Sequence, residues 1–230
     1  AVAAAVAAAR ARRRKRRARA DGRGPPPSME VPQEYKSAGV LFYTRDRAGE
    51  VSQVLLGVED RQVRLQDLNA GTKTQRMSVL LFPQGKRKQE DRNYYDTAMR
   101  EYVEETRDGA GLAAHLEGPA GGRPGAPPAA YFGDTGMAVI FCEVGACGSP
   151  PPRIDLPPYV RLRMRPAWVS VGELRHALAS ACRGTELSTN LGHYALYPQT
   201  RKVLASAAVL RWLGSAPRAG VSPRRKTKKG

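Results

Sequence analysis

Residues 85–106 read GKRKQEDRNYYDTAMREYVEET, and our prediction of the fold starts from this segment. Glu101, Glu104 and Glu105 lie on one side of a predicted helix, because residues at i, i+3 and i+4 share a helix face. Like charges at this spacing disfavour a helix by roughly 0.2–0.5 kcal/mol per pair, so the acidic face needs a counter-charge. A divalent cation such as Mg²⁺, which takes oxygen ligands, is one source. A solvated face neutralised by the flanking arginines is the other.

An apolar run precedes this stretch. Residues 77–82, MSVLLF, have strand character, and PQGK at 83–86 is predicted to turn the chain. A strand, a glycine turn, a basic loop and an acidic helix therefore follow one another within about thirty residues.

In this order of elements the chain resembles the Nudix hydrolases. Their signature is a glycine, an acid in the following loop, and then Arg-Glu-aliphatic-x-Glu-Glu-x-Gly-aliphatic. The match carries Gly85, Arg100, Glu101, Glu104 and Glu105. The resemblance implies an α/β fold, a Nudix-type α/β/α sandwich with a mixed β-sheet between helices. It also implies that residues 77–107 carry the active site.

Several positions depart from the signature, among them Asp108, which stands at its last aliphatic position. The loop is one residue longer than the pattern, so Glu90 or Asp91 fills its acidic position. Tyr102 stands at an aliphatic position, where a ring can still pack on a sheet. Arg107 stands at the glycine position, so we expect Gly109 to close the helix two residues late.

The resemblance implies hydrolysis of a pyrophosphate bond, in a nucleoside diphosphate linked to a group X or in a similar polyphosphate. Glu101, Glu104 and Glu105 would bind Mg²⁺ or Mn²⁺, which neutralises phosphates and lowers the pKa of an attacking water. With Arg100 they form the expected catalytic set, Arg100 holding the carboxylates by charge-assisted hydrogen bonds. Gly85 would permit the turn. The proton acceptor is one of these glutamates or an acid of a loop.

Substrate choice rests on residues beside this signature. Lys86, Arg87 and Lys88 are predicted to bind substrate, and their charges favour a highly anionic one. Residues 82–86, FPQGK, look like the same segment of bacterial RNA pyrophosphohydrolases and of the mRNA-decapping Nudix subunit. RNA 5′ ends, dinucleoside polyphosphates and diphosphoinositol polyphosphates all stay open. The alternative, motivated by the irregular loop and by Arg107, is a catalytically inactive Nudix-fold binding or scaffold module associated with RNA.

Basic charge is concentrated at the two ends of the chain. The formal net charge is +17 over 230 residues; residues 1–24 hold nine basic residues and one acid, and residues 216–230 hold six basic residues and no acid. Only +3 is left for the middle. We therefore expect a basic disordered extension at 1–28, one domain at 29–214 with a flexible loop around 109–130, and a basic disordered tail at 215–230.

The polybasic ends suggest a further hypothesis. Such segments bind phosphate backbones without sequence preference, act as nuclear import signals, or merely solvate. A nucleic-acid partner bound through them would be released by salt. The basic run suits cytoplasm and nucleus, while its Ala and Arg bias leaves the mitochondrion as the alternative. Met29 opens the segment of ordinary composition, so no function is assigned to the residues before it.

The remaining composition agrees with one domain. Hydrophobic residues make up 41% of the chain, which is enough for a core. No apolar run of about eighteen residues is present, so we expect no membrane span. The three cysteines give neither a disulfide framework nor CxxC spacing, and a reducing compartment is the simplest context.

Other segments have weaker patterns. Residues 161–165 alternate basic and apolar side chains, which on a strand would present three guanidinium groups either to phosphate oxygens or to solvent. The other expected elements are a hairpin of strands at 38–43 and 53–58, a long connection at 59–76, a break at 145–158, a helix ending near Ala181, and a closing helix at 198–213.

Overall fold

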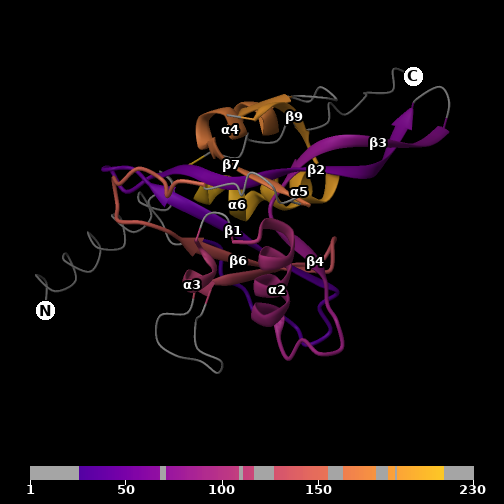
Figure 1. Ribbon diagram of the computed structural model, residues 1–230, viewed down its shortest axis with the longest axis horizontal. Helices are drawn as coiled ribbons and strands as arrows, with labels where there is room; N and C mark the ends of the chain where they lie inside the picture. Colours follow the sequence, from indigo (N-terminus) through magenta and orange to yellow (C-terminus); the bar gives the residue numbers. More distant parts are fainter. Residues whose placement is uncertain are drawn as a thin grey trace, which may run out of the picture.

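One mixed β-sheet with helices on both faces forms the core of the protein (Figure 1). The computed structural model describes residues 26–67, 71–108, 111–116, 127–154, 163–179, 186–189 and 191–214. Nine strands of this described part belong to the sheet. The chain is thus an α/β protein, as expected.

Strands and helices are distributed along the whole described chain. The strands are β1 (Ser37–Arg45), β2 (Val51–Asp67), β3 (Gly71–Leu81), β4 (Gln84–Lys86), β5 (Ala129–Phe132), β6 (Met137–Glu143), β7 (Arg165–Ser170), β8 (Glu186–Thr189) and β9 (Gly192–Leu196). The helices are α2 (Tyr94–Thr106), α3 (Ala113–Leu116), α4 (Val171–Ala179), α5 (Pro198–Leu204) and α6 (Ala207–Trp212).

β1 is the strand around which the sheet is organised. One edge pairs in parallel with β6, from Ser37↔Met137 to Tyr43↔Glu143. The other edge is shared, because β4 pairs with the first residues of β1 and β2 pairs with its last, both antiparallel. The continuous order is β5-β6-β1-β2-β3-β9-β8, and β7 pairs with β2. The parallel pairs β1–β6 and β3–β9 make the sheet mixed.

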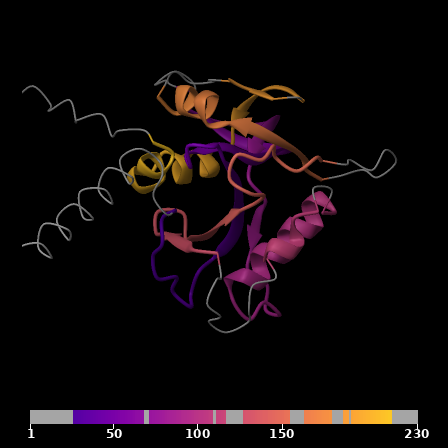
Figure 2. The ribbon, with the colours of Figure 1, turned by 90° about the vertical axis from the view of Figure 1, so that its left-hand side faces the viewer.

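The two faces of the sheet are covered by different helices. Phe42 of β1 packs on Tyr102 of α2, with ring centroids 5.0 Å apart. The next residue, Tyr43, packs on Trp212 of α6, with centroids 4.8 Å apart. Successive strand side chains point to opposite faces, so α2 and α3 cover one face and α4 to α6 the other (Figure 2). β1 is buried on both faces, which explains its continuous apolar run.

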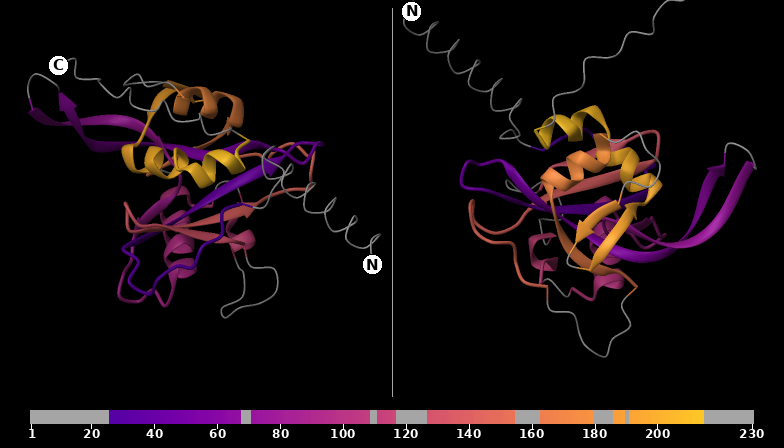
Figure 3. Two further views of the ribbon diagram at one scale, coloured as in Figure 1. Left: turned by 180° about the vertical axis from the view of Figure 1, so that it is seen from behind. Right: turned by 90° about the horizontal axis from the view of Figure 1, so that it is seen from above.

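The expected hairpin of the first two strands is confirmed, but the connection expected at 59–76 is wrong. β2 and β3 continue through it as one long antiparallel hairpin, whose register includes Arg61↔Met77 and Gln62↔Arg76. Its outer part extends beyond the rest of the sheet (Figure 3). Residues 59–76 are mostly polar and contain a glycine, so their sequence resembles a connection more than a pair of strands.

The carboxyl-terminal third differs from the prediction in two places. The helix predicted to end near Ala181 is α4, which is described as far as Ala179, and residues 180–185 lie outside the described residues. β8 and β9 form an unpredicted hairpin. The single closing helix is also wrong. Two helices replace it, because Ser206 has an extended ψ of 144° and its side chain accepts from the Val209 amide, which starts α6 anew.

The segment predicted as a flexible loop around 109–130 contains regular structure. α3 spans Ala113–Leu116, and β5 begins at Ala129. Leu112 and Leu116 are buried and pack in the α2 layer, which explains why this part is helical. Residues 109–110 and 117–126 lie outside the described residues, as do residues 1–25 of the extension predicted at 1–28 and the tail predicted at 215–230.

β7 begins at Arg165, so the strand predicted at 161–165 is present at Arg165 and wrong at residues 163 and 164. Arg163 and Met164 form a bend, in which Arg163 is exposed and Met164 is fully buried. Arg161 and Leu162 lie outside the described residues. No helix among the described segments is long and apolar enough to cross a membrane.

Candidate active site

α2 carries the acidic residues, and its start is fixed by a side-chain cap. Asn93 Oδ1 accepts from the amides of Tyr95 at 2.9 Å and Asp96 at 3.1 Å. With Tyr102 turned to the sheet, the glutamates lie on the side of the helix towards β4 and solvent. Relative exposures are 6% for Glu101 and 0% for Glu105, while the Glu104 side chain is 44% exposed.

Gly85 and Glu101 are packed too closely to admit any side chain at position 85. A Cβ placed on Gly85 would lie 1.9 Å from Glu101 Cδ and within 2.2 Å of both carboxylate oxygens. Gly85 is part of β4, paired with Ala38, and it does not have a positive φ. The prediction that Gly85 permits a turn is therefore wrong: glycine is needed for space, because the Glu101 carboxylate occupies the Cβ position.

Asp91, not Glu90, occupies the acidic position of the loop. Arg100 binds it with two parallel hydrogen bonds, Nε to Oδ1 at 3.0 Å and Nη2 to Oδ2 at 2.8 Å. Thr97 Oγ1 and the Lys88 amide also donate to Oδ2, each at 2.8 Å. Bonds from Arg100 first, then from Lys88 and Thr97, hold the pKa of Asp91 well below its ordinary value. Glu90 is exposed.

Arg100 connects this loop to the acidic face of the helix. Its Nη1 donates to Glu101 Oε1 at 2.7 Å and reaches Glu104 Oε2 at 3.5 Å. Its Nη2 also donates to the Lys86 carbonyl at 2.9 Å. The Asp91 hydrogen bonds, followed by those of Glu101, raise the pKa of Arg100. The predicted role of Arg100, holding carboxylates by charge-assisted bonds, corresponds to these contacts.

The three residues predicted to bind substrate lie in different surroundings. Lys86 is exposed and lines a pocket beside β4. Arg87 does not line this pocket, and its guanidinium lies 4.7 Å from the ring centroid of Tyr35. Lys88 Nζ pairs with Glu104 Oε1 at 3.1 Å, and this bond is the first cause of the lowered pKa of Glu104.

Glu105 is the most buried of the acids and has partners on two strands. Its Oε2 accepts a hydrogen bond from the backbone amide of Gln84 at 3.1 Å, and its Oε1 accepts one from Arg61 Nη2 at 3.2 Å. Arg61 also pairs with Glu59 Oε2 at 2.8 Å. Burial and then the charge of Glu59 raise the pKa of Glu105 to about 8, against the opposing effects of Arg61 and of the Gln84 amide.

The donor set fits a hard divalent cation in kind, because it consists of carboxylate oxygens. In the described part of the chain, however, no three His, Cys, Asp or Glu side chains form a group that could hold a metal ion. Arg100, Lys88 and Arg61 pair with Glu101, Glu104 and Glu105 respectively. In this arrangement the counter-charge of the acidic helix face comes from the protein itself.

The structure at the end of α2 gives a reason why a glycine would suit position 107, where this chain has an arginine. The helix ends at Thr106, and Arg107 adopts a left-handed φ of 53° while its amide donates to the Val103 carbonyl. The prediction of a later end at Gly109 is wrong for this reason. Arg107 and Asp108 both have positive φ, a conformation that costs a residue with a Cβ more than it costs glycine.

Three residues around the acids were not foreseen from the sequence. Glu59 is 6% exposed and accepts from Arg61 and from Arg163, the latter at 2.9 Å. Arg61 lies over the ring of Tyr197, with Cζ 5.2 Å from the centroid. The only available signal was an acid directly after the buried strand residues 54–58. Tyr197 lies near this site because β9, which ends one residue before it, pairs with β3 from a distant part of the chain.

No family model matches this chain, and no curated protein matches it either.

Proposed function

We propose that the protein is a metal-dependent hydrolase of the Nudix type that cleaves a pyrophosphate bond in a polyphosphate substrate. The observation that carries the proposal is the contact of Gly85 with the Glu101 carboxylate. This contact gives a physical reason for a glycine at position 85, because a side chain there would overlap the carboxylate of Glu101. Such a reason supports a site built around the carboxylate.

The proposed roles follow from the contacts. Glu101, Glu104 and Glu105 would hold Mg²⁺ or Mn²⁺, which supplies charge neutralisation of the phosphates and a more acidic water. Arg100 fixes the loop acid Asp91 and orients Glu101. The backbone amide of Gln84 and the guanidinium of Arg61 orient Glu105. Lys86, exposed beside the site, offers a cation to the phosphates.

The test is phosphate release by the full chain with Mg²⁺ or Mn²⁺. The panel holds capped and triphosphorylated RNA, dinucleoside polyphosphates, diphosphoinositol polyphosphates and nucleotide sugars. Glu104→Gln and Glu105→Gln should each lower the rate on the active class by a hundredfold or more, on the scale of losing a principal transition-state contact. Glu90→Gln, an exposed acid of the same loop, is the matched control and should keep the rate.

A second candidate is a catalytically inactive binding or scaffold module. It is favoured by the pairing of all three glutamates with cations of the chain itself. Absence of activity on the whole panel, with a cooperative unfolding transition, would support this candidate and reject hydrolysis.

A further inference from the structure

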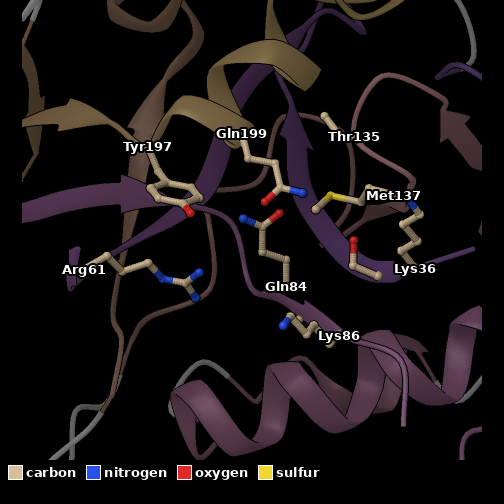
Figure 4. Close-up of a pocket in the computed structure, with 10 residues that line it drawn as sticks. Lys36, Arg61, Gln84, Lys86, Thr135, Met137, Tyr197 and Gln199 are labelled. Carbon is tan, nitrogen blue, oxygen red and sulfur yellow. The ribbon is translucent and has the colours of Figure 1, made fainter. Parts of the chain in front are cut away.

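A pocket of about 340 Å³ opens beside β4, next to the acidic helix (Figure 4). Its walls come from β1, β2, β4, the turn before β6 and the start of α5. The described lining includes the cations Lys36, Arg61 and Lys86 and contains no carboxylate. The pocket therefore has the charge of an anion site.

Gln84 gives the pocket a second kind of chemistry. The residue is 2% exposed, and neither its Nε2 nor its Oε1 has a hydrogen-bond partner. Figure 4 shows its amide in the middle of the pocket, directed towards the amide of Gln199 and away from β4. Buried polar atoms of native proteins are normally paired. An amide left without partners in a polar pocket points to a ligand that pairs with it.

The cations alone do not define that ligand. A phosphate group accepts hydrogen bonds and donates few, so it could pair with Lys36, Lys86 and the Nε2 of Gln84. It would leave Oε1 of Gln84 unpaired. The missing partner must present a donor and an acceptor side by side, which is the pattern that a glutamine amide reads on a base edge.

An aromatic wall completes the site. The Tyr197 ring borders the pocket on the side of Arg61, whose guanidinium lies over it. Planar rings stack on tyrosine and on arginine. Arg61 also pairs with Glu105, so this wall leads directly to the acids of α2.

We infer that this pocket binds the nucleobase of a nucleotide, with Gln84 pairing with the base edge, Tyr197 beside its ring, and Lys36 and Lys86 on its phosphates. The inference rests on the proposed function only for the direction in which the phosphates extend, towards Glu101 and Glu105. It selects nucleotide substrates over diphosphoinositol polyphosphates, which have no base. A free nucleotide and the 5′ nucleotide of an RNA share this chemistry.

Equilibrium binding without metal tests the inference separately from hydrolysis. The full chain in EDTA is titrated calorimetrically with ADP and with inorganic pyrophosphate, which carries the diphosphate alone. ADP should bind at least about tenfold more tightly than pyrophosphate, since one good bidentate base contact is worth that much. Equal affinities for the two would overturn the inference without involving any variant.

Gln84→Met removes the amide and keeps the length of the side chain. It should weaken ADP binding about tenfold and leave pyrophosphate binding unchanged. Gln53→Met is the matched control, because the buried Oε1 of Gln53 is also unpartnered but Gln53 does not line this pocket. An equal loss for ADP and pyrophosphate, or no loss for ADP, would contradict base recognition.

A third ligand, a short 5′-triphosphorylated RNA, tests whether the bound base belongs to a free nucleotide or to the 5′ end of an RNA. If it binds more tightly than ATP, and Gln84→Met removes the difference, the 5′ nucleotide of RNA is the occupant. Tighter binding of ATP assigns the pocket to free nucleotides. Hydrolysis of diphosphoinositol polyphosphates without ADP binding would sink the inference and keep the proposed function, whereas ADP binding without hydrolysis on any substrate would do the reverse.

Discussion

Arg100 holds Asp91 in a two-bonded, nearly buried ion pair across the loop that precedes its own helix. Asp91 is 5% exposed, and its carboxylate also accepts from Thr97 and from the Lys88 amide. The irregular loop is thereby fixed to α2 by its acid.

Asp91→Asn should therefore destabilise the protein strongly. Removing one charge leaves Arg100 without its main partner in a site that admits little water, and breaking a buried pair costs about 3 kcal/mol. The free energy of unfolding in urea measures this loss. Glu90→Gln, at the exposed neighbouring acid, should change it by less than about 0.5 kcal/mol. Similar effects at both positions would contradict the assignment of Asp91.

The same pair predicts a pH dependence. Since the folded pKa of Asp91 is lowered, its contribution to stability is complete above the unfolded value of about 3.9 and is lost as the pH falls below it. The stability difference between the wild type and Asp91→Asn should be constant from pH 5 to 7 and shrink below about pH 4. Unfolding curves across this range would refute the pair if the difference stayed constant in acid.

Gly85→Ala should disrupt the site through sterics. The new Cβ would fall on the Glu101 carboxylate, so either the helix or β4 must move. Forced overpacking costs about 1–3 kcal/mol, and the displaced Glu101 should abolish any hydrolysis. Gly133→Ala is a fair comparison, since the nearest atom to its added Cβ is 4.0 Å away. Thermal unfolding and activity are measured on both, and equal tolerance would remove the main support for the proposed function.

Arg107→Gly should stabilise the protein. Arg107 has a left-handed φ of 53° at the end of α2, and glycine adopts this conformation at about 1 kcal/mol less cost. Arg107→Ala removes the same side chain but keeps the Cβ, so it should gain little. A thermal midpoint that rises for both variants would trace the effect to lost charge and not to backbone conformation.

Glu105→Gln should make the metal-free protein more stable at alkaline pH, because it removes the cost of ionising a buried carboxyl group. The folded pKa of Glu105 is raised to about 8, so the folded state binds a proton that the unfolded state has released, and stability falls as the pH rises from about 4.5 to 8. In EDTA at pH 8 the variant should be more stable than the wild type by on the order of 2 kcal/mol. Glu104→Gln, at an exposed acid with a lowered pKa, should give no such gain. A stability loss for Glu105→Gln at pH 8 would contradict the raised pKa.

The local sequence was sufficient to predict the strands and helices whose apolar residues follow the pattern of a buried face. The runs at 38–43 and 53–58 became β1 and β2, and the helix with Glu101 and Glu105 became α2. The outer part of the β2–β3 hairpin was missed because residues 59–76 are mostly polar and contain a glycine, a composition that is typical of a connection. The break at Ser206 was missed because an N-cap serine inside an apolar run looks like one more helical position.

The site was predictable only along a single stretch of chain. Spacing placed Glu101 and Glu105 on one helix, but it could not show that Arg61 and Glu59 approach them from β2. Nor could it show that Gln84 faces a cavity bounded by Tyr197, since that neighbour is brought in by a parallel strand pair far along the chain. Both features depend on tertiary structure and have no local pattern.

The pairing of β1 with β6 has a consequence for synthesis. Tyr43 and Glu143 are register partners and are 100 residues apart in sequence, with the whole acidic helix between them. A chain emerging from the ribosome cannot complete the pairing of β1 with β6 until residue 143 is free. Parallel pairing at such separation is slow and leaves strand edges open in the meantime. β1, which is buried on both faces in the folded protein, therefore keeps the edge that pairs with β6 open until β6 has been made.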